Sequence, residues 1–245
     1  MDYKSIQKAL MLKKLAALFF SFLLVACGGG GGGSSSGSGV VASTLAFPLR
    51  QININQLENS SSAPFTVSGT YNGYSVTGSG NITDSRLMRD ATFEGKSALK
   101  QTSTITGTIT VNGQTAPLSS SDTTYVDPNY VLLGNSGNYY IVYADYSIPT
   151  SVYVNDTGTL VTGKKYASSI NKTLLGTLTV TYVVEADTAT TALVSIILTD
   201  KDNYGTVTET QTNQYRITAD GTSARVKFTI WTNTSTSKGT LVLSF

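Results

Sequence analysis

The chain contains no histidine, and cysteine occurs once in its 245 residues. Without histidine, Ser-His-Asp and Cys-His catalytic arrangements are excluded, and the commonest general base and metal ligand are absent. The single cysteine, Cys27, excludes a disulfide within the chain. We therefore expect no metal, no cofactor and no catalytic residues. Any acid–base chemistry would depend on carboxylates, lysines or tyrosines.

Charged residues are also scarce, since Asp, Glu, Lys and Arg together make up 13% of the chain. Of the 17 basic and 15 acidic residues, four lysines and one aspartate lie within residues 1–26, so the remainder has a net charge of −1. No basic patch is present to attract nucleic acid. We expect no nucleic-acid partner.

The first 27 residues have the order of an export signal. Four lysines precede or adjoin an apolar stretch, Leu15–Ala26, in which Ser21 is the only polar residue. This stretch is too short to span a membrane, which takes about 20 apolar residues. It ends Leu24-Val25-Ala26-Cys27, and here the chain resembles the bacterial lipoproteins, whose signal peptides end in this pattern.

The resemblance covers residues 1–27 only. It implies that residues 1–26 are removed and that Cys27 carries a diacylglycerol and an acylated amine. Because Gly28 rather than an aspartate follows, the family's sorting rule implies the outer membrane. The lipoprotein-processing and sorting machinery would then be partners, and the membrane would be bound through the lipid on Cys27. Translation could begin at Met1 or at Met11.

A glycine- and serine-rich segment follows, and residues 28–39 contain only these two residue types. Such a segment behaves as a flexible coil, and residues 27–44 would form a tether with a reach of roughly 20–25 Å. The body begins at residue 45. It is dense in Thr, Ser, Val, Ile and Tyr and lacks long stretches with helical apolar spacing, which predicts an all-β fold. We expect antiparallel meanders that form a sandwich or two curved-sheet halves, with one helical turn at 84–89.

Turn residues divide the body into strands. Asn72-Gly73 and Asn112-Gly113 predict hairpins with two-residue turns, and Asp220-Gly221 predicts a third hairpin. Pro149 and the segment 155–158 mark a boundary between an N-terminal half, 45–149, and a C-terminal half, 150–245. The two halves could be a duplication, similar hairpins with the same turn chemistry, or one continuous domain.

Several segments have an expected environment. The threonines at 102, 104, 106, 108 and 110 should form a row on a solvent-facing strand surface. Segments 139–148 and 192–198 are expected to be central strands, whereas 206–213 is polar on both faces and is expected at an edge or in a protruding hairpin. Tyrosines gather between 139 and 153, where core packing is the favoured interpretation over a ligand pocket. Asp200–Gly205 resembles the start of a calcium loop but is better interpreted as a turn.

The most direct interpretation is a membrane-anchored cell-envelope lipoprotein with a non-enzymatic β-rich body that binds a partner or has a structural role. The partner could be an envelope protein, a glycan or a lipid. One alternative is a carrier of lipids or other hydrophobic ligands in the periplasm. A second is a carboxylate-based hydrolase, for which the sequence indicates no pair of carboxylates. A third is an integral outer-membrane β-barrel, because the chain ends in an alternating apolar segment, Leu241–Phe245.

The pattern Leu24-Val25-Ala26-Cys27 generates a first prediction. Mass spectrometry of the mature protein should find Cys27 at the N-terminus with a diacylglycerol and an amide-linked acyl chain. Cys27→Ala should release the protein from the membrane fraction, because the anchor depends on this thiol. An unmodified N-terminus at another residue would contradict the prediction.

Overall fold

A computed structural model describes residue 40 and residues 42–245. The signal segment, Cys27 and most of the tether lie outside the described residues, so the predictions for them stay predictions. The described part contains one helix and thirteen strands. The helix is α2 (Leu49–Glu58), and the strands are β1 (Ser61–Tyr71), β2 (Tyr74–Asp84), β3 (Met88–Phe93), β4 (Lys96–Val111), β5 (Gln114–Val126), β6 (Leu132–Ser136), β7 (Tyr140–Tyr143), β8 (Thr157–Tyr166), β9 (Leu174–Ala186), β10 (Thr191–Asp202), β11 (Val207–Thr218), β12 (Ser223–Asn233) and β13 (Lys238–Ser244).

The hairpin predictions are confirmed. Asn72 and Gly73 have φ angles of 49° and 81°, and Asn112 and Gly113 have φ angles of 50° and 74°. Both pairs form two-residue turns, because the strands on either side are paired up to the turn. The third hairpin has a longer loop, residues 219–222, in which Gly221 has a φ of 89°.

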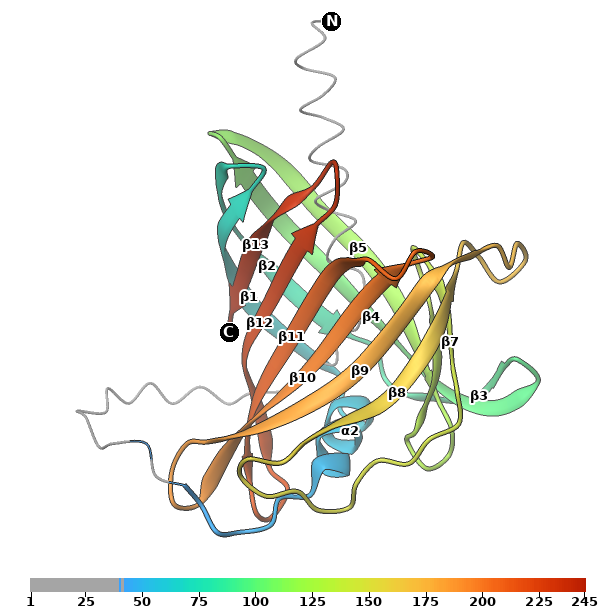
Figure 1. Ribbon diagram of the computed structural model, residues 1–245, viewed down its shortest axis with the longest axis vertical. Coiled ribbons are helices and arrows are strands. Elements are labelled where there is room, and N and C mark those ends of the chain that lie inside the picture. Colours follow the sequence, from blue (N-terminus) through green and yellow to red (C-terminus); the bar gives the residue numbers. More distant parts are fainter. Residues whose placement is uncertain (1–39, 41) are drawn as a thin grey trace, which may run out of the picture.

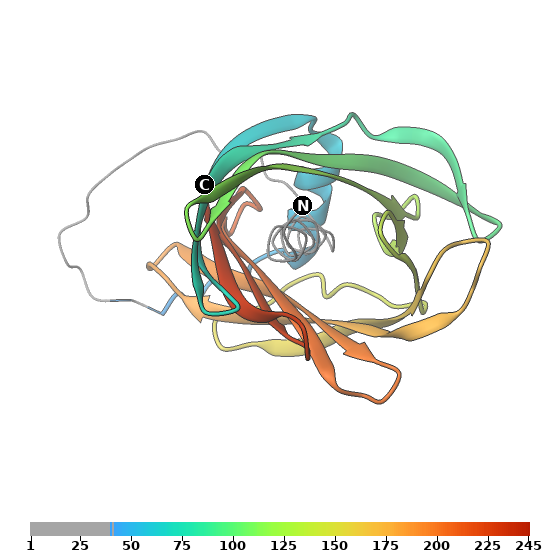
Figure 2. The same ribbon diagram turned by 90° about the horizontal axis from the view of Figure 1, so that it is seen from above.

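All neighbouring strands pair antiparallel, which confirms the predicted fold class. The sheet order is β2-β1-β13-β12-β11-β10-β9-β8-β7-β6-β5-β4-β3, and β2 also pairs with β4. This last pairing closes twelve strands into one barrel and leaves β3 outside the ring (Figures 1 and 2). Strands from 45–149 and from 150–245 therefore belong to one closed sheet.

The length of β4 explains why β2 skips β3 in the pairing. β4 has 16 residues. Its first part, Lys96–Lys100, pairs with β3, whereas its later part, Ser103–Val111, pairs with β2. One edge of β4 therefore serves two partners in succession, and β3 extends away from the ring beside the start of β4 (Figure 1).

Side chains alternate between the two faces of the wall, with apolar residues inside and serine or threonine outside. On β4, Ile105, Ile109 and Val111 are buried, while Thr106 and Thr108 between them are exposed. The row of threonines at 102–110 therefore lies on the outer face, as predicted. The same alternation lines the interior with apolar side chains that form two clusters.

Helix α2 lies at one end of the barrel, within the outline of the ring when the barrel is seen from above (Figures 1 and 2). Leu49, Ile52 and Leu57 are buried and share one apolar cluster with inward residues of β8, β9, β10 and β11. This helix is not predicted from the sequence. The helical turn predicted at 84–89 is wrong, since residue 84 ends β2 and β3 begins at residue 88. No helix in residues 42–245 is long and apolar enough to cross a membrane.

The expected central strand at 139–148 is wrong beyond its first residues. β7 ends at Tyr143, and residues 144–156 form a connection that crosses the α2 end of the barrel before β8. Within this connection Val152 pairs with Phe47, just before α2. Ile148 is buried at this end of the barrel and Tyr146 packs against the same apolar cluster, whereas Ala144, Asp145 and Ser147 are exposed, so the segment does not continue a strand.

The closing pair of strands generates a second prediction. Gly107 of β4 lies opposite Gly80 of β2, and a β-carbon on Gly107 would lie 2.3 Å from the carbonyl oxygen of Ser79 and 2.7 Å from the Cα of Gly80. Backbone atoms cannot move aside without opening the pair. We expect Gly107→Ala to lower the free energy of unfolding, measured with urea, by about 1–3 kcal/mol.

The neighbouring Thr108 supplies the matched control, because it is exposed on the outer face of the same strand. Thr108→Val should change the free energy of unfolding by no more than about 0.5 kcal/mol. Equal effects of the two substitutions would contradict a tight β2–β4 contact.

Candidate functional site

The barrel interior contains ionisable side chains among its apolar residues, and these form the candidate site. Charged groups are seldom buried without a partner, because leaving water is costly for the charged form. Apart from tyrosines, six ionisable residues take inward positions on the strands: Asp84, Asp122, Lys165, Asp200, Glu209 and Arg225. They come from six different strands, so only the closed barrel brings them into one interior.

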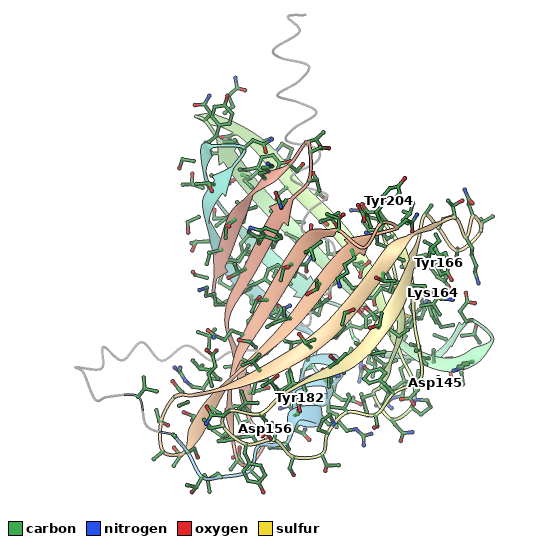
Figure 3. All side chains as sticks on the ribbon, viewed as in Figure 1. Asp145, Asp156, Lys164, Tyr166, Tyr182 and Tyr204 are labelled. Atoms are coloured by element: carbon green, nitrogen blue, oxygen red, sulfur yellow. The ribbon has the colours of Figure 1, made fainter. Side chains whose placement is uncertain are left out.

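One group of charges lies toward the hairpin end of the barrel, away from α2. Lys165 of β8 donates to both carboxylate oxygens of Asp200 on β10, at 2.6 and 2.5 Å. Glu209 of β11 lies directly opposite Asp200 in the strand register and accepts a hydrogen bond from Gln211. The ammonium group of Lys165 also lies 4.9 Å from the centre of the Tyr139 ring. Figure 3 marks this end of the barrel by Tyr204, in the turn between β10 and β11.

The two carboxyl groups of this cluster share a single cation. Burial raises the pKa of Glu209 to about 7, and the nearby charge of Asp200 adds to this effect. Burial also raises the pKa of Asp200, although Lys165 opposes the change. Glu209 can therefore gain or lose a proton near neutral pH, whereas Asp200 is held as the partner of Lys165.

A second group lies toward α2. Asp84 accepts hydrogen bonds from Ser61 at 2.8 Å and from Ser103 at 2.5 Å, and burial raises its pKa to about 6. Gln101 of β4 donates to the backbone carbonyls of Gln56 and Leu57, at 3.2 and 3.3 Å. Because these carbonyls belong to the last turn of α2, Gln101 fixes the helix to the wall.

A third carboxyl group lies between these two groups along the wall. Asn135 of β6 donates to Asp122 at 3.2 Å and to Thr124 at 3.0 Å, both on β5. Burial raises the pKa of Asp122 to about 8. Asp122 is therefore mostly protonated at neutral pH, which spares the interior an unpaired negative charge.

The polar segment 206–213 has a different position from the predicted one. It belongs to β11, which lies between β10 and β12 and is not an edge strand. Gln211 and Asn213 are buried on the inward face. The prediction failed because polar side chains were taken as evidence of solvent, whereas the barrel interior itself is polar here.

The tyrosines between residues 139 and 153 do not share one site. Tyr143 is buried on the inward face of β7, and burial raises its pKa well above the usual value. Tyr140 is buried on the outer face, where its ring lies 5.2 Å from that of Phe93. Tyr153 is 52% exposed. The core interpretation therefore fits Tyr140 and Tyr143.

The segment Asp200–Gly205 does form the predicted turn. The carboxylate of Asp202 accepts hydrogen bonds from the backbone of Tyr204 and Thr206, both at 2.9 Å. Within residues 42–245, no group of three carboxyl, thiol or imidazole side chains is arranged to hold a metal ion.

None of these six interior ionisable residues was predicted from the sequence, although one signal is present in it. Glu209, Gln211 and Asn213 alternate in phase with Tyr215 and Ile217 on the same strand. Two large apolar residues in that phase indicate the inward face, so the three polar residues before them belong inside as well. Comparison of the chain with protein-family models, curated proteins and solved structures gives no match.

The raised pKa of Glu209 generates a third prediction. The carboxyl group of the unfolded chain titrates near pH 4.5, whereas that of the folded protein titrates near pH 7. The folded state therefore binds the proton more tightly, and stability falls as the pH rises from about 4.5 to about 7. Glu209→Gln should remove about 2–3 kcal/mol of this fall, measured by urea unfolding at pH about 5 and about 8.

Glu185→Gln is the matched control, because Glu185 is an exposed glutamate on the outer face of β9. This variant should keep the pH dependence of the unmodified protein. A Glu209→Gln variant with unchanged pH dependence would show that Glu209 does not titrate in the interior.

Proposed function

We propose that this chain is a lipid-anchored protein of the bacterial outer membrane whose barrel is non-enzymatic and binds an apolar ligand in its interior. The observation that carries the proposal is the closure of twelve strands with their apolar faces turned inward. Cys27 would hold the protein at the membrane, and the described chain enters the barrel at the α2 end (Figure 1).

The number of strands supports a ligand-binding interior. The diameter of a barrel grows roughly in proportion to its strand number, and eight strands enclose a space that side chains fill or that holds one small ligand. Twelve strands enclose a wider space than this. Inward glycines on the closing strands, among them Gly78, Gly80 and Gly107, add no side-chain volume to it.

Polar atoms on the inner wall also support a bound molecule. The side-chain oxygens Gln211 Oε1, Thr232 Oγ1 and Asn135 Oδ1 are buried and make no hydrogen bond with the described residues. Leaving such atoms unpaired costs about 1–3 kcal/mol each. A ligand with a polar group, or water carried with it, would satisfy them.

The outer face favours an anchored barrel over the integral membrane barrel considered above. Strands that face lipid carry a wholly apolar outer band. Here the outward residues of β2 are Ser75, Thr77, Ser79, Asn81 and Thr83, and all are exposed. The apolar residues of the final strand, Leu241 and Leu243, face the interior instead and are buried there.

The hydrolase alternative now has a definite pair of carboxylates. Asp200 and Glu209 are directly opposite each other, which places their β-carbons about 4.5–5.5 Å apart. Lys165 binds both oxygens of Asp200, so this carboxylate is occupied as an ion-pair partner. A hydrolase would lose its activity in Glu209→Gln, whereas a binding protein would show no activity to lose.

The proposed function generates a fourth prediction. The full chain carrying Cys27→Ala should bind a neutral, environment-sensitive naphthylamine probe saturably, with one class of sites. Ala116→Trp should weaken this binding by about tenfold, because Ala116 is an inward residue of β5 and the indole would occupy the interior. The midpoint of thermal unfolding should change little, because the proposal predicts an interior with room for the larger side chain.

Thr115→Trp is the control, because Thr115 is exposed on the outer face of the same strand. It should leave probe binding unchanged. If the unmodified interior took up no probe, or if Ala116→Trp destabilised the protein by the 1–3 kcal/mol typical of an overfilled core, the ligand-binding proposal would be wrong.

A further inference from the structure

Arg225 differs from the other buried cation of the barrel in having no carboxylate partner. Its side chain is 7% exposed and lies on the inward face of β12. Lys165 is paired with Asp200, but none of the five ion pairs in residues 42–245 includes Arg225. A buried guanidinium without a paired counter-ion is strongly disfavoured, which makes Arg225 a candidate for binding an anionic ligand.

Two aromatic rings hold the guanidinium group in place. Its central carbon lies 5.6 Å from the ring centre of Tyr215, the cross-strand neighbour on β11, and 5.2 Å from that of Phe245. Nη2 donates to the Tyr215 hydroxyl at 3.2 Å. The other two nitrogens, Nε and Nη1, are buried and make no hydrogen bond with the described residues. The guanidinium group is therefore held in place, but only one of its three nitrogens donates a hydrogen bond to the described residues.

Further unused polar groups lie beside Arg225. Ser223, the preceding inward residue of β12, has a buried hydroxyl with no partner in the described part of the chain. Burial raises the pKa of the Tyr215 hydroxyl, and Gln56 of α2 lies close enough to oppose this rise slightly, yet neither atom of the Gln56 amide makes a hydrogen bond of standard geometry. The side chain of Asn55 donates to the carbonyl of Gly221 at 2.8 Å, which joins α2 to the start of β12.

Asp84 does not serve as the missing counter-ion. Burial raises the pKa of Asp84 and the positive charge of Arg225 opposes this rise, but no contact within ion-pair distance joins the two groups. The oxygens of Asp84 instead accept hydrogen bonds from Ser61 and Ser103. The unpaired N–H groups of Arg225 are therefore available to an oxyanion of a bound ligand.

We propose that Arg225, with Ser223 and Gln56, binds the monoanionic head group of a single-chain amphiphile, a carboxylate or a phosphodiester, inside the barrel. This inference rests on the proposed function and names its ligand class. A single guanidinium balances a single negative charge, and its planar donors match the oxygens of a carboxylate or phosphate. Stacking on aromatic rings keeps it ready for such a group.

The wall beyond Arg225 suits the apolar part of such a ligand. Phe228 and Ile230 follow on the inward face of β12, and Leu243 and Leu241 lie opposite them on β13. From residue 225 to residue 232 the strand rises about 23 Å, at about 3.3 Å per residue. An extended acyl chain would lie along this wall with its head group near α2 and its tail toward the hairpin end.

Calorimetric titration of the full chain carrying Cys27→Ala tests the inference. The probes are a long-chain fatty acid, the fatty alcohol of equal length and lysophosphatidylglycerol with the same chain. We expect the acid, the lysophospholipid or both to bind at least about tenfold more tightly than the alcohol, because a hydrogen bond to a charged group is worth that factor. The two anionic probes distinguish a free acid from a phospholipid head group as the natural source.

Arg225→Met should remove the preference for the anionic probes and leave the affinity for the alcohol unchanged. Arg216→Met, on the outer face of β11, is the matched control and should keep the preference. Should Arg225→Met fail to fold, Arg225→Lys replaces it and should weaken the anionic probes alone. Equal binding of acid and alcohol by the unmodified barrel, or a preference that survives in Arg225→Met, would overturn the inference but not the proposed function. Failure of every probe to bind would instead contradict the proposed function itself.

Discussion

The pairing of β2 with β4 is the contact on which the rest of the structure depends. It joins the two ends of a sheet that would otherwise have exposed edges, and it runs over nine consecutive residue pairs from Val76–Val111 to Asp84–Ser103. Closure leaves β2 and β4 no free edge along this stretch, so their backbone groups are satisfied without help from neighbouring molecules. It also divides every strand into an inner and an outer face. The serine and threonine residues of the outer face and the apolar residues of the inner face have a single consistent arrangement only in the closed barrel.

Closure also creates an interior in which burying a charged group costs free energy. Four of the six inward ionisable residues are accommodated by local means: Lys165 and Asp200 neutralise each other, Asp84 receives two hydroxyl hydrogen bonds, and Asp122 keeps its proton near neutral pH. Glu209 is intermediate, because its pKa of about 7 leaves it partly protonated and partly ionised near neutral pH. Arg225 forms no ion pair with a carboxylate of the described residues. Proteins retain destabilising features mainly where function requires them. The difference between Arg225 and the other interior charged residues therefore supports an anionic ligand bound at Arg225.

Local features of the sequence predicted the local features of the fold. The Asn-Gly turns, the outer row of threonines on β4 and the turn after Asp200 each follow from a few neighbouring residues, and each is present in the structure. Closure was not predictable in this way, because β2 and β4 meet only after β3 is passed over. Helix α2 was missed because its sequence, LRQININQLE, is largely polar, and its apolar residues are buried by the barrel instead of by a helical partner. The interior charges were missed for the same reason: their environment is made by strands distant in the sequence.

The placement of α2 constrains how an amphiphile could reach the proposed site. The helix lies at the end nearest Arg225 and is held there by Gln101, which binds its last carbonyls, and by the buried residues Leu49, Ile52 and Leu57. A ligand that entered from the hairpin end would have to pass its charged head group along the apolar wall of β12 and β13 before reaching Arg225. Its route would begin beside Lys165, Asp200 and Glu209, which line the interior toward that end. A ligand that entered at the other end would displace α2 but would insert its tail first, without moving a charge through the apolar region. The lower electrostatic cost favours the second route, and it would make α2, joined to β12 through Asn55 and Gly221, the element that must move when a ligand is exchanged.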